Sequence, residues 1–252
     1  MRGAAPQGAR TEQEAARWVR AMFARVAHRY DLANHLLSFN IDRRWRSHAV
    51  GRLRPILQRP DARVLDLCCG TGDLLLELWC ASPPPSRERE GAVVLGSDFC
   101  HPMLLGARAK ILRRHARASL FEADALRLPL GDASLDLVTV AFGFRNLANY
   151  QAGLAEIGRV LRPGGMAAIL EFSQPPNALF RALYNFYSRR LLPWIGGALS
   201  GSRDAYAYLP ESVRQFPSAA ELAEGMRRAG FAEVRFECLT GGIVALHLGT
   251  VA

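Results

Sequence analysis

An acidic residue followed by two glycines is the feature of this chain most able to do chemistry. In VLDLCCGTGD, Asp66 precedes Gly70 and Gly72 in the pattern D-x-x-x-G-x-G. A dinucleotide-binding loop would have a third glycine where Leu75 stands, and a phosphate-binding loop would have a lysine after its last glycine. Neither is present. Because a carboxylate is a poor neighbour for pyrophosphate, the pattern favours a cationic nucleotide without phosphate, and S-adenosylmethionine has that chemistry.

Two further acids follow the next two predicted strands. Asp98 ends AVVLGSD, and Asp124 ends SLFEAD. Ligands of open α/β sheets bind at the carboxyl ends of the strands, so Asp98 is placed to accept hydrogen bonds from ribose hydroxyls and Asp124 from the adenine amine. Any one of these acids could be an ordinary strand-end or helix-cap residue. Three acids at three consecutive strand ends instead predict a site for S-adenosylmethionine.

Short apolar runs flanked by turn residues predict the strands that position these acids. The runs are RVLDL (63–67), AVVLGSD (92–98), SLFEAD (119–124), LDLVTVAF (135–142) and MAAILEF (166–172). Segments with helical pattern lie between them, at 73–80, 102–114 and 151–161, and RPGG closes the last. This alternation predicts an α/β fold with a mostly parallel sheet and helices on both faces.

The two ends of the chain add helices and a hairpin. A helix is predicted before the strands, and SAAELAEGMRRAG predicts another, with Ser218 as its cap and a glycine end. The runs 231–239 and 242–250 predict a terminal hairpin, which leaves room for one reversed strand near the C-terminus. We expect a single domain over 1–252, with an N-terminal helical segment (1–50) and an aromatic-rich helical insertion (175–217).

Composition limits the location and the partners of the chain. No window reaches the roughly 18 apolar residues of a membrane span, and the N-terminus lacks the apolar stretch of a secretory signal, so we expect a cytoplasmic protein. The five cysteines are odd in number and contain no C-x-x-C, which indicates neither a disulfide framework nor a zinc site. We expect Cys68 and Cys69 to be small spacers in the loop rather than reactive thiols.

The formal charge of +9 attracts both nucleic acid and anionic membrane surfaces. A methyltransferase acting on exocyclic amines of nucleic acid would have an Asn- or Asp-Pro-Pro-aromatic motif after the fourth strand. That position reads AFGFRN, and QPPN follows the fifth strand instead. The sequence therefore predicts no nucleic-acid partner.

Longer stretches carry a resemblance to a known family. YDLANHLLSFNIDRRW (30–45) and RVLRPGGMAAILEFS (159–173) resemble the two signatures of the ubiquinone/menaquinone biosynthesis C-methyltransferases. FGFRN (142–146), DAYAYLPESVRQFP (204–217) and GGIVALHLG (241–249) are also similar, so the resemblance covers nearly everything after about residue 20. It implies a class I, Rossmann-like methyltransferase fold and S-adenosylmethionine-dependent methylation of a ring carbon of a polyprenyl hydroquinone, with no metal.

The resemblance and the loop together assign the cofactor site. The predicted cofactor-binding residues are Asp66, Gly70, Thr71, Gly72, Asp98, Asp124, Ala125 and Ala141. The chain departs from the family pattern at four positions: Ala33 and Asp42 replace Met and His, Arg162 replaces Lys, and Ala141 stands where relatives often have Ser.

Arg145 in FGFRN is the first candidate for a residue that takes part in the reaction through its positive charge. It follows the fourth strand at the carboxyl edge of the sheet, where it could stabilise a quinolate or orient a water molecule. The alternative is a structural arginine paired with a carboxylate. Asp31, Tyr206 and Tyr208 are candidates for contacts to the substrate hydroxyls, and loop-anchoring hydrogen bonds are the alternative for these three.

Further alternatives stay open from the sequence alone. LFRALYNFYSRRLLPWIG (179–196) mixes aromatic residues with arginines and could lie on the inner face of a membrane or form a lid on the sheet. The ring could be a naphthoquinol or a benzoquinol, and another small aromatic substrate is a third choice. A non-catalytic cofactor-binding scaffold of a quinone-synthesis assembly is the alternative to an enzyme. A homo-oligomer is compatible with the sequence.

Overall fold

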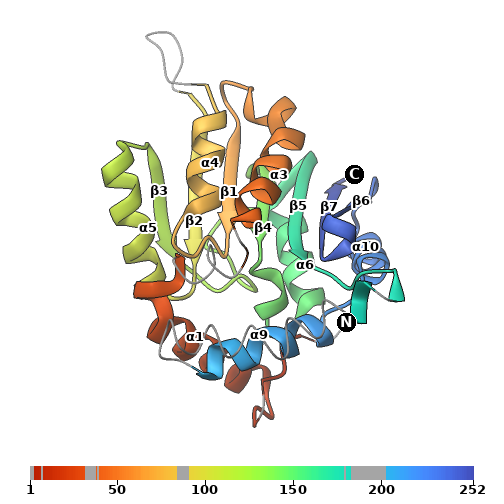
Figure 1. The fold of residues 1–252 in the computed structure, drawn as a ribbon. Coiled ribbons are helices and arrows are strands. Elements are labelled where there is room, and N and C mark those ends of the chain that lie inside the picture. Colours follow the sequence, from red (N-terminus) through yellow and green to blue (C-terminus); the bar gives the residue numbers. More distant parts are fainter. Residues whose placement is uncertain are drawn as a thin grey trace.

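Seven strands form one sheet in the order β3-β2-β1-β4-β5-β7-β6 (Figure 1). The computed structural model describes residues 3–6, 8–31, 38, 40–83, 91–178, 180–182 and 203–252. Strands β1 to β5 pair in parallel, whereas β7 is antiparallel to both β5 and β6. The predicted α/β fold, with its mostly parallel sheet and one reversed strand, is confirmed. The strands are β1 (Arg63–Leu67), β2 (Val93–Asp98), β3 (Ala118–Glu122), β4 (Leu135–Ala141), β5 (Leu161–Phe172), β6 (Arg235–Leu239) and β7 (Val244–Thr250).

Helices cover both faces of this sheet (Figure 1). Because side chains alternate along a strand, Val64 packs with one apolar cluster and Leu65 with the other. The cluster of Val64 includes side chains of α3 (Ile41–Leu57), α4 (Asp73–Ala81) and α5 (His101–Arg114). The cluster of Leu65 includes those of α6 (Tyr150–Val160) and α10 (Ala219–Arg228).

The ends of α10 follow the expected local chemistry. The Ser218 hydroxyl accepts a hydrogen bond from the backbone N–H of Glu221, and the Glu221 carboxylate accepts one from the backbone N–H of Ser218, which completes a capping box. Gly230, just beyond the helix, has a φ of +96°. The predicted helix with a serine cap and a glycine end is therefore confirmed.

The start of β5 differs from the prediction. RPGG ends the helix as expected, since α6 stops at Val160, but β5 begins at Leu161 rather than at residue 166. A register shift between Leu135 and Leu137 of β4 accommodates the glycines. Gly164, at a φ of +73°, donates its backbone N–H to the Val251 carbonyl. The proline and glycines therefore bend the strand without ending its pairing.

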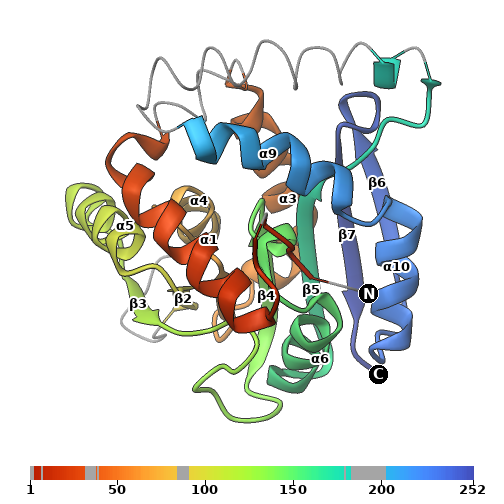
Figure 2. The ribbon, with the colours of Figure 1, turned by 90° about the horizontal axis from the view of Figure 1, so that it is seen from below.

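Two helices cross the carboxyl ends of the strands. These are α1 (Glu12–Val26), continued by η1 (Ala27–Arg29), and α9 (Arg203–Gln215), and they lie next to each other across that edge (Figure 2). The rings of Trp18 and Tyr208 join them, with centroids 5.1 Å apart. We call α1, η1 and the following residues to Asp31 the roof. Of the predicted insertion, 183–202 lies outside the described residues.

The helical part of the N-terminal segment runs past residue 50, because α3 continues to Leu57. Within the described parts of the chain, no helix combines the length and the apolar character needed to cross a membrane. The division of 1–252 into one domain with two helical additions stays a prediction.

Candidate active site

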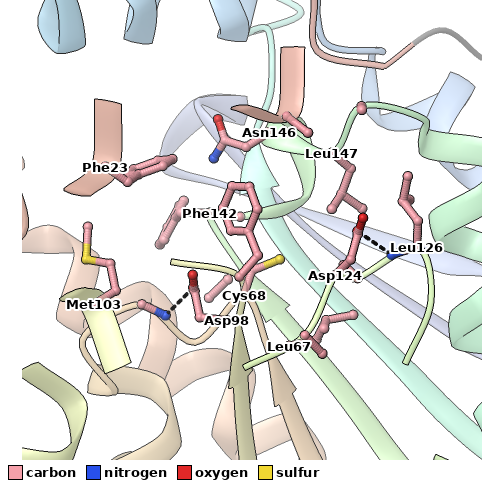
Figure 3. A pocket seen from close by; sticks show the side chains of 18 of the residues that line it. Phe23, Leu67, Cys68, Asp98, Met103, Asp124, Leu126, Phe142, Asn146 and Leu147 are labelled. Carbon is pink, nitrogen blue, oxygen red and sulfur yellow. Dashed lines mark hydrogen bonds between the residues drawn. The ribbon is translucent and has the colours of Figure 1, made fainter. Parts of the chain in front are cut away.

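A cavity lies between the carboxyl ends of β1, β2 and β4 and the roof (Figure 3). It encloses about 740 Å³, including solvent at its mouth, which is within the usual range for small-molecule sites. Loops after four strands and three roof residues form its walls. The lining includes Cys68, Gly70, Asp98, Phe99, Asp124, Ala125, Ala141, Phe142, Gly143 and Asn146 from the strand ends and the loops that follow them, and Ala16, Phe23 and Tyr30 from the roof.

Asp98 holds the glycine loop at the edge of the cavity. Its Oδ2 accepts a hydrogen bond from the backbone N–H of Gly70, and its Oδ1 accepts one from that of Cys100, both at 2.9 Å. The residue is 7% exposed, and burial raises the pKa of its carboxyl above the ordinary value. Because Gly70 and Asp98 both line the cavity, one carboxylate shapes the loop and also presents an acceptor to a ligand.

Asp66 lies behind the loop, where it is almost completely buried. Its Oδ1 accepts a hydrogen bond of 3.0 Å from the Thr139 hydroxyl, while its Oδ2 has no partner among the described residues. Burial raises the pKa of this carboxyl to about 7. Because burial disfavours the charged form of this carboxyl, a cationic group brought to the loop would stabilise it.

The loop after β3 supplies the far wall of the cavity. Asp124 accepts a hydrogen bond at Oδ1 from the backbone N–H of Leu126, at 2.9 Å. The neighbouring Ala125 is 5% exposed. Figure 3 shows Asp124 and Asp98 as parts of different walls. A ligand with a ribose at one end and a base at the other would meet both acids.

Five of the eight predicted cofactor residues line the cavity: Gly70, Asp98, Asp124, Ala125 and Ala141. Asp66 lies in β1 just before the loop, and Gly72 lies in the loop. Neither belongs to the described lining of the cavity. The Thr71 hydroxyl, also outside that lining, donates a hydrogen bond to the Asp31 carboxylate and accepts one from Lys110. Their assignment as cofactor residues stays a prediction.

Backbone strain is concentrated where two loops meet in the cavity. Cys68 and Phe142 both have a φ of +57°, which is unfavourable for residues with a Cβ. Gly143 packs so closely on Cys68 that a Cβ at position 143 would lie 2.4 Å from the Cys68 Cβ. Burial raises the pKa of the Cys68 thiol well above its ordinary value, which keeps it neutral. Cys68 is therefore a strained spacer whose thiol is not activated.

Arg145 forms an ion pair with a buried carboxylate, the arrangement that the sequence left open as the alternative to a role in the reaction. Its Nη1 is 2.9 Å from Oε1 of the buried Glu171 and also donates to the Phe142 carbonyl. Burial disfavours the charged guanidinium, but Glu171, Tyr30 and Tyr208 together outweigh this effect and raise the pKa of Arg145. Nε is buried and has no partner among the described residues. The described lining of the cavity includes the adjacent Asn146 but not Arg145.

The other catalytic candidates are divided between the roof and α9. The Tyr208 hydroxyl donates a hydrogen bond of 3.2 Å to Oδ1 of Asn146, and burial raises the pKa of Tyr208 to about 12. Asp31 ends the roof and contacts Thr71 and Lys110. Tyr206 lies on α9, and its side chain is outside the described part. Contacts of these residues to substrate stay predictions.

The sequence did not predict that the roof forms part of the site. Helical spacing predicted a leading helix, but only its packing across the strand ends brings Phe23 and Tyr30 to the cavity. The start of the first family signature at Tyr30 was the signal that could have pointed there.

Three of the four departures from the family pattern lie in the described structure. Asp42 is buried, where it accepts a hydrogen bond from Ser38 and pairs with Arg46. Arg162 pairs with Asp136, and Ala141 lines the cavity. Ala33 lies outside the described residues. Among those that are described, no group of three or more metal-binding side chains occurs.

The sequence of this chain matches one family of known proteins. The model of the ubiE/COQ5 methyltransferase family matches residues 10–251. A demethylmenaquinone methyltransferase of Thermus thermophilus is 48% identical over 228 residues, which cover 90% of this chain and 99% of that relative. One of Deinococcus radiodurans is 45% identical, with 94% of each chain covered. A ubiquinone/menaquinone biosynthesis C-methyltransferase UbiE of Syntrophotalea carbinolica is 45% identical, covering 91% of this chain and 92% of the relative.

Solved structures share the fold at low sequence identity. A SAM-dependent methyltransferase of Thermotoga maritima has a TM-score of 0.62 and 17% identity, and the match covers 93% of this chain and all of that one. A phosphoethanolamine N-methyltransferase of Haemonchus contortus, in complex with S-adenosyl-L-methionine, has a TM-score of 0.55 and 18% identity. That match covers 77% of this chain and 38% of the other.

Proposed function

Because this chain belongs to the ubiE/COQ5 methyltransferase family, we propose that it methylates demethylmenaquinol, a polyprenyl naphthohydroquinone. The chain is an S-adenosylmethionine-dependent C-methyltransferase of quinone biosynthesis. The choice of the naphthoquinol is supported by the two relatives named for demethylmenaquinone. The observation that carries the proposal is the cavity at the strand ends, walled by Asp98, Asp124 and the roof.

Substrate choice can be tested directly. The purified protein is incubated with labelled S-adenosylmethionine and, in separate reactions, with demethylmenaquinol or a methoxy-benzoquinol, each kept reduced. We expect the label on the naphthoquinol ring with the higher kcat/KM. Faster transfer to the benzoquinol would reject the choice of ring. Tight cofactor binding with label on neither ring would favour the scaffold.

The residues around the cavity divide the work of the reaction. The cofactor supplies an electrophilic methyl group on a sulfonium. Asp98 and Asp124 are proposed to bind the ribose hydroxyls and the adenine amine. Asp66 is proposed to attract the ammonium of the cofactor from behind the loop. Ala141, which lines the cavity, is proposed to leave room for the cofactor. Holding the methyl donor and the ring carbon in line contributes on the order of 7 to 11 kcal/mol, so these positioning contacts are the larger part of catalysis.

A ring carbon becomes nucleophilic when a neighbouring hydroxyl loses its proton. A phenol pKa near 10 leaves about three units, or roughly 4 kcal/mol, to be supplied at neutral pH. Arg145 is proposed to stabilise the quinolate charge, since its buried Nε is a donor without an acceptor among the described residues. Asn146 and Tyr208, which are hydrogen-bonded to each other, are proposed to orient the ring hydroxyls.

The role of Arg145 can be separated from its structural ion pair. Arg145→Ala alone would leave Glu171 charged, buried and unpaired, a loss of about 3 to 5 kcal/mol in stability. The double variant Arg145→Met/Glu171→Gln removes both charges and is expected to fold. Its kcat is expected to fall about 100-fold, as for loss of one donor to a developing charge, with unchanged affinity for S-adenosylhomocysteine. Full turnover by a folded double variant would leave Arg145 a purely structural residue.

Cofactor affinity is expected to fall at acidic pH. The pKa of Asp66 is about 7 in the free protein, so its carboxyl is mostly neutral below that value and charged above it. A ligand with an ammonium prefers the charged form of Asp66, and S-adenosylhomocysteine keeps its ammonium throughout the acidic range tested. Calorimetry should show affinity decreasing by up to about tenfold per pH unit between 6.5 and 5. Asp66→Asn should flatten this dependence, whereas a flat profile in the parent would contradict it.

Membrane contact is the remaining part of the proposal. A polyprenyl quinol resides in the bilayer, and the aromatic and arginine-rich stretch 179–196 has the composition of a surface-binding helix. Flotation of the full chain with phosphatidylglycerol vesicles tests this contact. Unchanged vesicle binding after deletion of 177–199 would remove the stretch from the proposal.

A further inference from the structure

The single lysine of the chain lies where three elements meet. Of the 32 lysine and arginine residues, only residue 110 is lysine, and its side chain on α5 is 15% exposed. Its Nζ is 2.7 Å from Oδ2 of Asp31, 2.5 Å from Oδ1 of Asp73 and 3.1 Å from the Thr71 hydroxyl. An ammonium carries three hydrogens, so each has an acceptor here.

This geometry requires a compact cation. A guanidinium is planar and presents its donors as a rigid fork, whereas an ammonium directs three donors from one atom. Three acceptors that converge on one point therefore suit lysine and not arginine. The other 31 lysine and arginine positions are all arginine, so composition alone does not explain the lysine at position 110.

The three acceptors belong to the roof and to the cofactor loop. Asp31 ends the roof, in which Phe23 and Tyr30 line the cavity. Thr71 lies within the loop, and Asp73 is the first residue of α4. The Thr71 hydroxyl also donates directly to Asp31. Lys110 thus connects the cover of the cavity to the loop at its base.

The charged side chains around Lys110 make the contact between the roof and the cofactor loop depend on this lysine. Arg46 lies 3.4 Å from Asp73 and also pairs with Asp42 and Glu77, at 2.9 and 3.2 Å. Among the described side chains, Lys110 and Arg46 together pair with four carboxylates, those of Asp31, Asp42, Asp73 and Glu77. Without Lys110, Asp31 and Asp73 would lose the cation between them, and their like charges would repel.

We propose that Lys110 is a latch that holds the roof closed over bound cofactor and sets how slowly the cofactor leaves. The roof crosses the strand ends that carry the cavity (Figure 2), so release requires the contact between Asp31 and Lys110 to open. Lys110 is a positioning residue, because its contacts are with the loop and the roof and not with the reacting atoms. The inference rests on the cofactor of the proposed function and is independent of the quinol.

The uniqueness of Lys110 allows the latch to be observed in the unsubstituted protein. Sulfosuccinimidyl acetate modifies amines, and peptide mass spectrometry can follow Lys110 with the α-amino group of the chain as internal reference. Saturating S-adenosylhomocysteine is expected to slow acetylation of Lys110 by about fivefold or more, since ligand binding favours the closed form. Equal rates with and without the ligand would overturn the proposal.

Variants then measure the release itself. Lys110→Met is expected to speed dissociation of S-adenosylhomocysteine about tenfold, equivalent to about 1.4 kcal/mol, and to raise the KM for S-adenosylmethionine with little change in kcat. Asp31→Asn should speed this dissociation to a similar degree, and the two substitutions together should add little more to the rate. Lys110→Arg should restore slow release only in part. Arg227→Met, which breaks an exposed pair with Glu224 on α10, is the matched control and should change nothing.

Unchanged dissociation in folded Lys110→Met, or a fall in kcat at constant KM, would contradict the latch. The labelling measurement decides the matter even where a variant does not fold. The labelling and dissociation measurements use S-adenosylhomocysteine alone, so failure of the quinol assay and failure of the latch are distinguishable.

Discussion

Asp98→Ala is expected to weaken binding of S-adenosylhomocysteine by a factor of at least 100. The carboxylate fixes the backbone N–H groups of Gly70 and Cys100, each at 2.9 Å, and it lines the cavity. Hydrogen bonds to charged groups contribute about 1.5 to 3 kcal/mol each, so loss of the two proposed to the ribose hydroxyls corresponds to roughly two to four orders of magnitude in affinity. The alanine variant also leaves the loop without its anchor.

Calorimetric titration of the folded variants measures this effect. Asp98→Asn keeps the size of the side chain and one acceptor oxygen, so it should fall between the parent and Asp98→Ala. Asp61→Ala, which removes an exposed acid before β1, is the control and should bind as the parent does. A loss of less than fivefold in Asp98→Ala would show that the loop keeps its shape without this carboxylate.

Gly143→Ala is expected to abolish measurable cofactor binding and to destabilise the fold by about 3 kcal/mol or more, as severe overpacking does. The new Cβ would lie 2.4 Å from the Cβ of Cys68, a distance that no side-chain rotation relieves. The two loops would have to separate, and both form walls of the cavity. Thermal unfolding and cofactor titration measure the two effects.

A second substitution provides the decisive control for Gly143. Cys68→Gly removes the atom that would clash, and it also removes the strain of a φ of +57°. The double variant Cys68→Gly/Gly143→Ala should therefore recover most of the stability and binding that Gly143→Ala loses. Gly51→Ala, at an open position in α3, should be neutral or slightly stabilising. Additive losses in the double variant would reject the steric explanation.

The fold and the loop acids could be predicted because their signals are local. Asp98 and Asp124 each follow a short apolar run directly, so their place at the edge of the sheet depends only on the identification of those strands. The partner of Arg145 could not be found in this way. Glu171 is 26 positions away, and it meets Arg145 only because β4 and β5 are neighbours in the sheet.

The role of the roof was hidden for the same reason. Spacing of apolar residues predicts that a helix forms, but not the surface on which it packs. Lys110 could be recognised as the one lysine, yet its acceptors come from two segments, at Asp31 and at Thr71 and Asp73, about 40 positions apart in sequence. Such convergence depends on tertiary structure. The inclusion of RPGG in β5 likewise depends on tertiary structure. Val251, just after β7, exchanges backbone hydrogen bonds with Gly164 and Gly165 and so continues the pairing past the glycines.

The place of β7 has a consequence for how the protein is made. Val244–Thr250 is the last strand along the chain, yet it lies between β5 and β6 inside the sheet. During synthesis, β5 therefore presents an unpaired edge until these residues have left the ribosome, and β6 emerges before it has a neighbour to join. Exposed strand edges promote association between chains. The nascent protein thus passes through a stage in which its cofactor half can be assembled while its sheet is still open to intermolecular pairing.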